Sequence, residues 1–189
     1  MPTVTLSEAR SRAQQSMLYK SASSIIAESM MKQLSQQNYD VFLSHSFADR
    51  ELVIGLKGLL EDHKYTVYVD WFEDPSLDRS NITAETIKLL RGRMNFCKCL
   101  FYSVTPNSEH SNWMPWECGY MDGKTGRSAI FPLTTLRSNS FSGREYLQAY
   151  PYVTIDQMAN GSTLFFVRTN SSTYCSLDHW LKGNEPFGH

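Results

Sequence analysis

Short apolar runs, separated by polar or amphipathic segments, extend over most of the chain. Five such runs predict buried strands, at residues 39–44, 66–70, 97–104, 128–133 and 152–155. Apolar residues at helical spacing predict helices over residues 49–63 and 81–93, and a further short helix begins near residue 111 and ends around 123–126. Strands that alternate with helices through short connections indicate an α/β fold, here a flavodoxin-like doubly wound parallel sheet of about five strands.

The two ends of the chain differ from this alternating region. Residues 1–37 contain no glycine, and a rough helical stripe predicts an N-terminal helical extension with Ser7 as a possible cap; the stripe is Leu18, Ile25, Ile26, Met30 and Leu34. This extension packs on the main fold or on a second copy of the chain, or it forms a simple tail. Residues 164–168 fit a strand or a helix, and residues 176–182 predict a short helix. We therefore expect an extension at 1–37 and a domain at 38–189, with its core at 38–156 and a C-terminal elaboration at 157–189.

Composition and charge narrow the functional classes. The 189 residues carry a formal net charge of −1, so no general basic excess neutralises phosphates, and we expect no nucleic-acid partner. No apolar run approaches the length of a membrane span and no signal peptide is visible, which indicates a cytoplasmic protein with no membrane partner. Cys97 and Cys99 fall in an apolar run at a poor spacing for a disulfide, so buried thiols are expected.

Polar and aromatic residues gather where the predicted strands end. In doubly wound folds, ligands bind at the carboxyl ends of the strands, near the point where the strand order reverses. The residues at these positions are Ser44, His45, Ser46 and Phe47 after the first strand, Asp70 and Trp71 after the second, and Trp113 and Glu117 beyond the loop after the third. Three clusters at one edge of the sheet predict a binding site, with Glu117 as a candidate functional carboxylate.

The segment 111–122, SNWMPWECGYMD, predicts the helix that carries this carboxylate. Ser111 or Asn112 can cap the helix, and Pro115 falls in its first turn, where a missing N–H does no harm. Helical spacing places four residues on one face, namely Trp113, Glu117, Tyr120 and Met121. A lone Glu near a helix start is usually solvated and favoured by the helix dipole. The prediction that Glu117 is functional therefore depends on the polar and aromatic clusters at the neighbouring strand ends.

Several competing motifs fail on their chemistry. The MDGKTG segment, 121–126, resembles a phosphate loop, but Cys118 stands where the first glycine is needed, so we expect a helix-terminating turn with Gly123 or Gly126 in the left-handed conformation. The acidic residues of a response-regulator receiver are missing after the first and third strands. No Gly-x-Ser-x-Gly elbow supports a serine hydrolase, and the histidines away from the strand ends have no ligand-like grouping, so no metal is expected.

Three segments together resemble a Toll/interleukin-1 receptor (TIR) domain. YDVFLS at 39–44 is similar to the first strand of that family, VYVD at 67–70 is similar to its second strand, and residues 71–80 stand where its mobile loop lies. SNWMPWE at 111–117 matches the Ser-x-Trp-x-x-x-Glu pattern at the start of its third helix. The resemblance covers roughly residues 38–156, and it is specific because three segments occur in order at the right spacing.

The resemblance implies an enzyme that cleaves NAD at the nicotinamide–ribose bond, of the kind found in Thoeris-type antiphage defence. NAD is then the substrate and no cofactor is needed, and the product is an ADP-ribose-derived signal, cyclic or transferred, read by a downstream effector. Glu117 matches the catalytic Glu of the family enzymes. The residues expected to bind the substrate are Ser44, His45, Ser46, Phe47, Tyr68, Asp70, Trp71, Ser111 and Trp113. For Trp113 and Tyr68, a place in the hydrophobic core is the alternative.

Two alternatives stay open. TIR domains also act as non-catalytic scaffolds that self-associate through the loop after the second strand, here 71–80, and a homo-oligomer formed through this loop and the N-terminal helices is expected in either case. A nucleoside deoxyribosyltransferase-like enzyme shares the fold type and also uses a Glu on a ribosyl centre. The chemistry suits one carboxylate, because cleavage of an N-glycosidic bond develops oxocarbenium character that a carboxylate stabilises.

Overall fold

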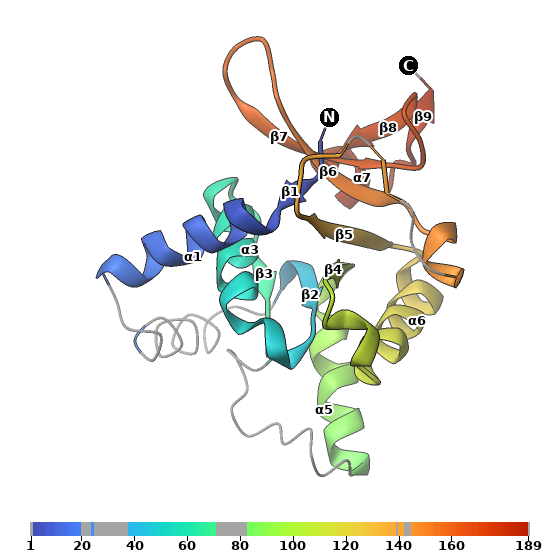
Figure 1. The fold of residues 1–189 in the computed structure, drawn as a ribbon. Helices are drawn as coiled ribbons and strands as arrows, with labels where there is room; N and C mark the ends of the chain where they lie inside the picture. Colours follow the sequence, from blue (N-terminus) through green and yellow to red (C-terminus); the bar gives the residue numbers. More distant parts are fainter. Residues whose placement is uncertain are drawn as a thin grey trace.

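The computed structural model describes residues 2–19, 24, 38–70, 83–138, 140–141 and 145–188. Within these residues the strands form one nine-stranded sheet. Its parallel part has the order β3-β2-β4-β5-β6 (Figure 1), and the strands are β2 (Tyr39–Ser44), β3 (Val67–Tyr68), β4 (Cys97–Val104), β5 (Ser128–Thr134) and β6 (Tyr152–Gln157). The chain passes from β2 outward to β3 and then back to the other side of β2, at β4. This order confirms the predicted flavodoxin-like doubly wound fold.

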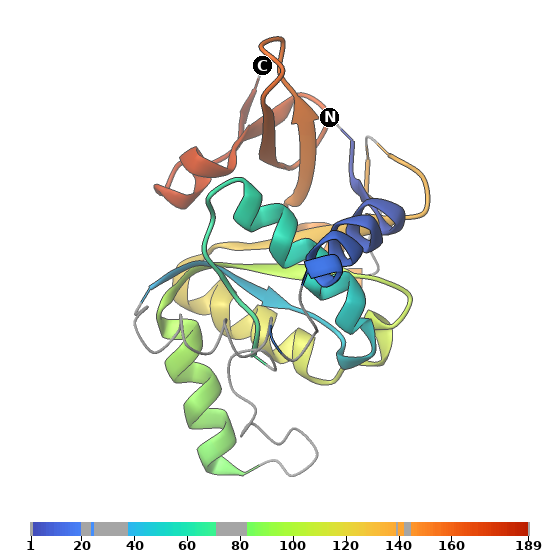
Figure 2. The ribbon, with the colours of Figure 1, turned by 90° about the vertical axis from the view of Figure 1, so that its left-hand side faces the viewer.

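Helices cover both faces of the sheet (Figure 2), which the alternation of side chains along each strand requires. On one face, Val41, Leu43 and Phe101 pack under α3 (Arg50–Asp62) and belong to the larger core cluster. On the other face, Phe42 and Leu100 pack against α5 (Ala84–Asn95) and α6 (Trp113–Thr125). Thr83 caps α5 through a capping box with Thr86; the caps expected at residues 80 and 81 lie outside the described residues.

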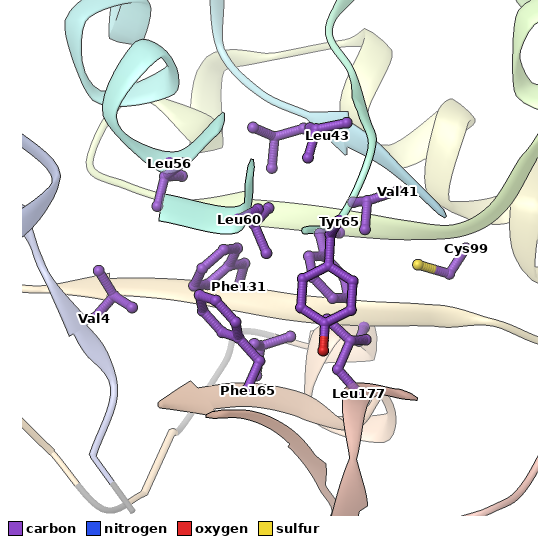
Figure 3. Packing of buried hydrophobic residues seen from close by; sticks show 14 of the residues in the cluster. Val4, Val41, Leu43, Leu56, Leu60, Tyr65, Cys99, Phe131, Phe165 and Leu177 are labelled. Atoms are coloured by element: carbon purple, nitrogen blue, oxygen red, sulfur yellow. The ribbon is translucent and has the colours of Figure 1, made fainter. Parts of the chain in front are cut away.

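The larger cluster joins segments that are far apart in the sequence. In Figure 3, Leu56 and Leu60 of α3 face Phe131 of β5 and Phe165 of β7. The Phe131 and Phe165 rings meet edge to face with their centroids 6.1 Å apart. All four cysteines are buried and none forms a disulfide, as expected for Cys97 and Cys99. Among the described residues, none of the helices has the length and apolar character of a membrane-spanning segment.

The N-terminal residues are part of this core. Strand β1 (Val4–Thr5) pairs in parallel with the end of β5, and the Pro2 carbonyl accepts a hydrogen bond of 2.9 Å from the N–H of Ile155 in β6. Helix α1 (Leu6–Tyr19) then packs along α3 and buries Ala9 and Ala13 completely. Of the expected alternatives, residues 2–19 therefore show the one in which the extension packs on the main fold.

Two details of the predicted extension are wrong. The cap is Thr5, whose hydroxyl accepts the N–H of Glu8 at 3.1 Å while the Glu8 carboxylate accepts the N–H of Thr5 at 2.9 Å, and Ser7 already lies inside the helix. Leu18 is 75% exposed, because alanines rather than the large apolar residues face α3. The other members of the predicted stripe, at 25, 26, 30 and 34, lie outside the described residues.

The C-terminal elaboration extends the sheet with antiparallel strands. These are β7 (Thr163–Arg168), β8 (Thr173–Ser176) and β9 (Phe187–Gly188). Residues 164–168, which fit either a strand or a helix, are thus a strand. The predicted final helix is α7 (Leu177–Leu181), capped by the Ser176 hydroxyl and anchored by the buried Trp180. A 3₁₀ helix, η3 (Glu145–Ala149), precedes β6, and Leu147 of this helix packs on the α6 face of the core.

Candidate active site

Glu117 lies on the face of α6 that is turned toward the sheet. The residues that α6 buries are Met114, Glu117, Cys118 and Met121. This face differs slightly from the predicted one, because Trp113 and Tyr120 are only half-buried, and Tyr120 stacks on Trp116 with ring centroids 5.9 Å apart. Glu117 has no exposed surface at all. A buried carboxylate needs compensating donors, so its partners indicate what the site is built for.

Ser44 supplies such a donor. Its hydroxyl donates a hydrogen bond of 2.6 Å to Oε2 of Glu117, across 73 residues of sequence. Ser44 is the last residue of β2 and points to the same face as Phe42, which is the face that α6 covers. A hydroxyl that donates to a carboxylate makes a charge-assisted hydrogen bond. The end of β2 and the second turn of α6 are therefore joined at the reversal point of the strand order, between β2 and β4.

His45 and Asp70 lie together at the same edge of the sheet. Nδ1 of His45 donates to the Leu43 carbonyl at 2.9 Å, because a carbonyl oxygen can only accept. Nε2 of His45 lies 3.6 Å from Oδ1 of Asp70, so the two form an ion pair whenever the ring is protonated. Both side chains are 2% exposed. The predicted convergence of the loops after the first two strands is thus present in the structure.

The other predicted residues have different environments. Ser46 is buried and its carbonyl accepts the N–H of Asp49 at 3.0 Å, whereas Phe47 is 57% exposed. Ser111 accepts the N–H of Met114 at 3.3 Å, so of the two candidate caps it is Ser111 that supplies the side-chain oxygen. Trp113 meets Trp116 edge to face, with centroids 5.7 Å apart. Trp71 lies outside the described residues.

Tyr68 lies in the core rather than at the surface of the site. It has no exposed surface, stacks on Phe42 with centroids 5.4 Å apart and meets Tyr39 edge to face at 5.5 Å. The rings of Phe42 and Tyr39 therefore both contact the Tyr68 ring. This environment supports a role in packing beneath the site rather than direct stacking on a ligand.

Two buried residues near the site were not predicted from the sequence. Tyr102 pairs directly with Ser44 across the β2–β4 ladder and faces α6; burial raises its pKa, and the negative charge of Glu117 adds to this effect. Asp49, at the end of the 3₁₀ helix η1 (Phe47–Asp49), is 5% exposed and accepts hydrogen bonds from Thr105 and Asn107. Neither residue stands in a recognisable motif, so only its three-dimensional neighbours reveal it.

No group of three or more His, Cys, Asp or Glu side chains among the described residues is arranged to hold a metal ion. Burial raises the pKa of the neighbouring Cys118 to about 11, which keeps this thiol protonated near neutral pH. Glu117 with Ser44, and His45 with Asp70, are therefore the polar groups that define the site.

The chain has the architecture of a flavodoxin-like doubly wound α/β domain, a class of folds that bind ligands at the switch point, where Ser44 and Glu117 meet. No family model matches the chain. Its sequence is 41% identical to the probable 3′ cyclic ADP-D-ribose synthase ThsB′ of Bacillus cereus (strain MSX-D12), over 167 residues that make up 87% of this chain and 86% of that protein. A shorter match, 29% identical over 83 residues, links 43% of this chain to 22% of the putative cyclic ADP-D-ribose synthase TIR2 of Cytobacillus dafuensis. The chain belongs to the TIR family, in the group that contains the Thoeris ThsB′ protein.

Proposed function

We propose that this protein is a TIR enzyme that consumes NAD and makes a cyclic ADP-ribose signal in antiviral defence. The observation that carries the proposal is the buried carboxylate of Glu117, held by the Ser44 hydroxyl at the switch point of the sheet. The similarity to a protein named as a cyclic ADP-ribose synthase, over most of both chains, supports the same reaction.

The chemistry requires one well-placed negative charge. Cleavage of the bond between C1′ of the ribose and the nicotinamide nitrogen releases neutral nicotinamide, because the bond electrons move to the positively charged ring. The ribose acquires oxocarbenium character in the transition state, as in glycoside hydrolysis. A carboxylate fixed beside this charge stabilises the transition state more than the ground state. Glu117 is proposed to supply that carboxylate, and Ser44 to fix its orientation.

The remaining residues of the edge are proposed to hold the substrate. His45 and Asp70 follow the first two strands of the parallel sheet, β2 and β3, and Ser46 and the exposed ring of Phe47 come after His45 in the same loop. Trp113 stands one turn before Glu117 on α6, and Ser111 fixes the start of that helix. Trp71 is proposed as a further contact on the basis of sequence alone.

A cyclic product requires that water be kept from the reacting ribose, so that a nucleophile of the same molecule attacks instead. Glu117 has no exposed surface, and Tyr102 beside Ser44 is also buried. A site that excludes water favours an internal acceptor over hydrolysis. The burial of these side chains and the similarity to a protein named as a cyclic ADP-ribose synthase together support cyclisation of the ADP-ribose unit.

We also propose that the protein works as a homo-oligomer in the cytoplasm and that a separate effector reads its product. The loop 71–80 and the N-terminal helices are the proposed contacts between copies. The buried cysteine thiols, none of them in a disulfide, support a reducing compartment.

The experiment is to incubate the purified protein with NAD, with and without a crowding agent that promotes assembly, and to identify the products by mass spectrometry. We expect nicotinamide together with a cyclic isomer of ADP-ribose. Linear ADP-ribose alone would contradict the cyclisation. No turnover in either condition would favour a scaffold, and cleavage of deoxynucleosides but not NAD would favour a deoxyribosyltransferase.

A further inference from the structure

We infer that Asp49 is a positioning residue for the proposed reaction: it clamps the loop after β2 to the loop after β4 and so keeps Glu117 beside Ser44. This inference rests on the proposed function. Asp49 accepts hydrogen bonds from the Thr105 hydroxyl at 2.5 Å and from the Asn107 side-chain amide at 2.6 Å. The bonds span 56 and 58 residues and join the two loops that flank the candidate site.

The hydrogen bonds of the Asp49 carboxylate are unusual for a residue at the start of a helix. It is the N-cap residue of α3, where an Asp commonly accepts the first free N–H groups of its own helix. Here the side chain makes no such cap hydrogen bond. The carboxylate is 5% exposed and is directed to the neighbouring loop instead. The local stabilisation of a cap is therefore replaced by a contact between two loops.

The direction of the bond from Thr105 is fixed by its other partners. The Thr105 hydroxyl oxygen accepts the backbone N–H groups of Asn107 at 3.1 Å and Ser108 at 3.2 Å. Its proton is therefore directed at Asp49. The Ser108 hydroxyl in turn donates to the Thr105 carbonyl at 2.8 Å. The turn at residues 105–108 is thus fixed by its own hydrogen bonds, and Asp49 binds this turn as a rigid unit.

Hydrogen bonds continue from this loop to the first turn of α6. The N–H of Ser111 donates to the Ser108 carbonyl at 3.2 Å, and the Ser111 hydroxyl accepts the N–H of Met114. On the other side, the N–H of Asp49 donates to the carbonyl of Ser46, two residues after Ser44. A displacement between the two loops would therefore move Glu117 relative to Ser44, although Asp49 itself need not touch the substrate.

The test compares Asp49→Ala with Asp40→Ala. Asp40 lies near the other end of β2 and accepts two hydrogen bonds from Thr66, at 2.8 and 3.0 Å, and one from Lys98 at 2.8 Å, so it is a half-buried clamp far from the site. We expect Asp49→Ala to lower kcat on NAD by about tenfold or more and to change KM less, since small misplacements of reacting groups cost rate. Asp40→Ala is expected to leave kcat within about twofold while lowering the melting temperature similarly.

Two further variants separate positioning from charge and from misfolding. Asp49→Asn keeps both hydrogen bonds if the Asn107 amide turns to present its oxygen. We therefore expect the kcat of this variant to lie within about threefold of wild type. If Asp49 acted through its negative charge, the Asn side chain would not restore kcat. Asn107→Ala removes one bond only and remains informative if Asp49→Ala does not fold; a smaller drop in kcat is expected.

Turnover by the wild-type protein with unchanged kcat in Asp49→Ala would overturn the role of Asp49 and leave the proposed function intact. Equal losses of kcat in Asp49→Ala and Asp40→Ala would also overturn it, because the effect would then follow stability alone. A wild-type protein that does not turn over NAD would instead overturn the proposed function, and the positioning role of Asp49 in that reaction with it.

Discussion

The hydrogen bond from Ser44 to Glu117 is the contact between single residues on which the proposed catalysis depends most. Both side chains are buried, so no water replaces the hydroxyl if it is removed without a change of structure. A hydrogen bond to a charged group contributes about 1.5–3 kcal/mol, which corresponds to roughly ten- to a hundredfold in rate if the bond is needed in the transition state.

We therefore predict that Ser44→Ala lowers kcat for nicotinamide release by about tenfold. The matched control is Ser103→Ala on the neighbouring strand β4, since Ser103 is equally buried but alternates with Tyr102 and so faces away from α6. Steady-state kinetics of both variants give the comparison. An equal loss in the two variants would contradict a specific role for Ser44.

The sequence predicted the residues of the site that follow strands directly. Ser44, His45 and Asp70 were placed correctly at one edge of the sheet because the carboxyl ends of parallel strands must meet there. For Tyr68 the sequence left a core position and a substrate contact open, because β3 is only two residues long and its pattern does not decide between them. Asp49 could not be identified either, since a lone Asp at a helix start usually caps that helix.

At the scale of secondary-structure elements, the closest approach of another backbone to a glycine occurs where α1 crosses α3. A Cβ atom on Gly55 would lie 1.8 Å from the carbonyl oxygen of Ala9. The backbones of the two helices meet at this point, with Ala9 and Ala13 completely buried between them. Only glycine at position 55 leaves room for this approach.

We predict that Gly55→Ala lowers the free energy of unfolding by about 1–3 kcal/mol or more, because the added methyl group forces α1 away from α3. Gly92→Ala is the control: nothing lies within 4 Å of its Cβ, and it stands inside α5, so alanine is expected to stabilise the protein by about 0.5–1 kcal/mol. Urea denaturation of both variants measures the difference. A neutral Gly55→Ala would contradict the close crossing.

The accuracy of the element predictions follows the length and regularity of each element. The bounds of β2 and β4 were predicted to the residue, because each is a continuous apolar run in a covered sheet. The turn at Gly126, with φ of 62°, was one of the two predicted ends of α6. Strands β1, β8 and β9 have two to four residues each and were missed. Such short strands carry no periodic signal, and their pairing is decided by distant partners.

At the scale of the whole molecule, the N-terminal segment and the C-terminal strands enclose one core. Val4 of β1 and Phe165 of β7 belong to the same cluster as Leu56 of α3 (Figure 3). Arg12 of α1 forms a bidentate ion pair with Asp62 of α3, at 2.6 and 2.9 Å. The division of the chain into an extension at 1–37 and a domain at 38–189 stays a prediction, which a truncated protein can test.

We predict that deletion of residues 1–19 lowers the melting temperature by about 10 °C or more, because it uncovers the α3 surface around Gly55 and the edge of β6 at Ile155. Differential scanning calorimetry at matched concentration measures the shift. A deletion variant as stable as the full chain would show that the segment is an independent extension.

The most direct test of the central claim is the release of nicotinamide from NAD by Glu117→Gln beside the wild-type protein. Glutamine preserves the size of the side chain and can still accept the Ser44 hydrogen bond, but it removes the negative charge. We predict that nicotinamide release by Glu117→Gln falls by a factor of about 10³ or more while its melting temperature stays near or above that of wild type, since a buried charge has been removed. Undiminished release by the folded variant would contradict the assignment of Glu117 as the catalytic carboxylate.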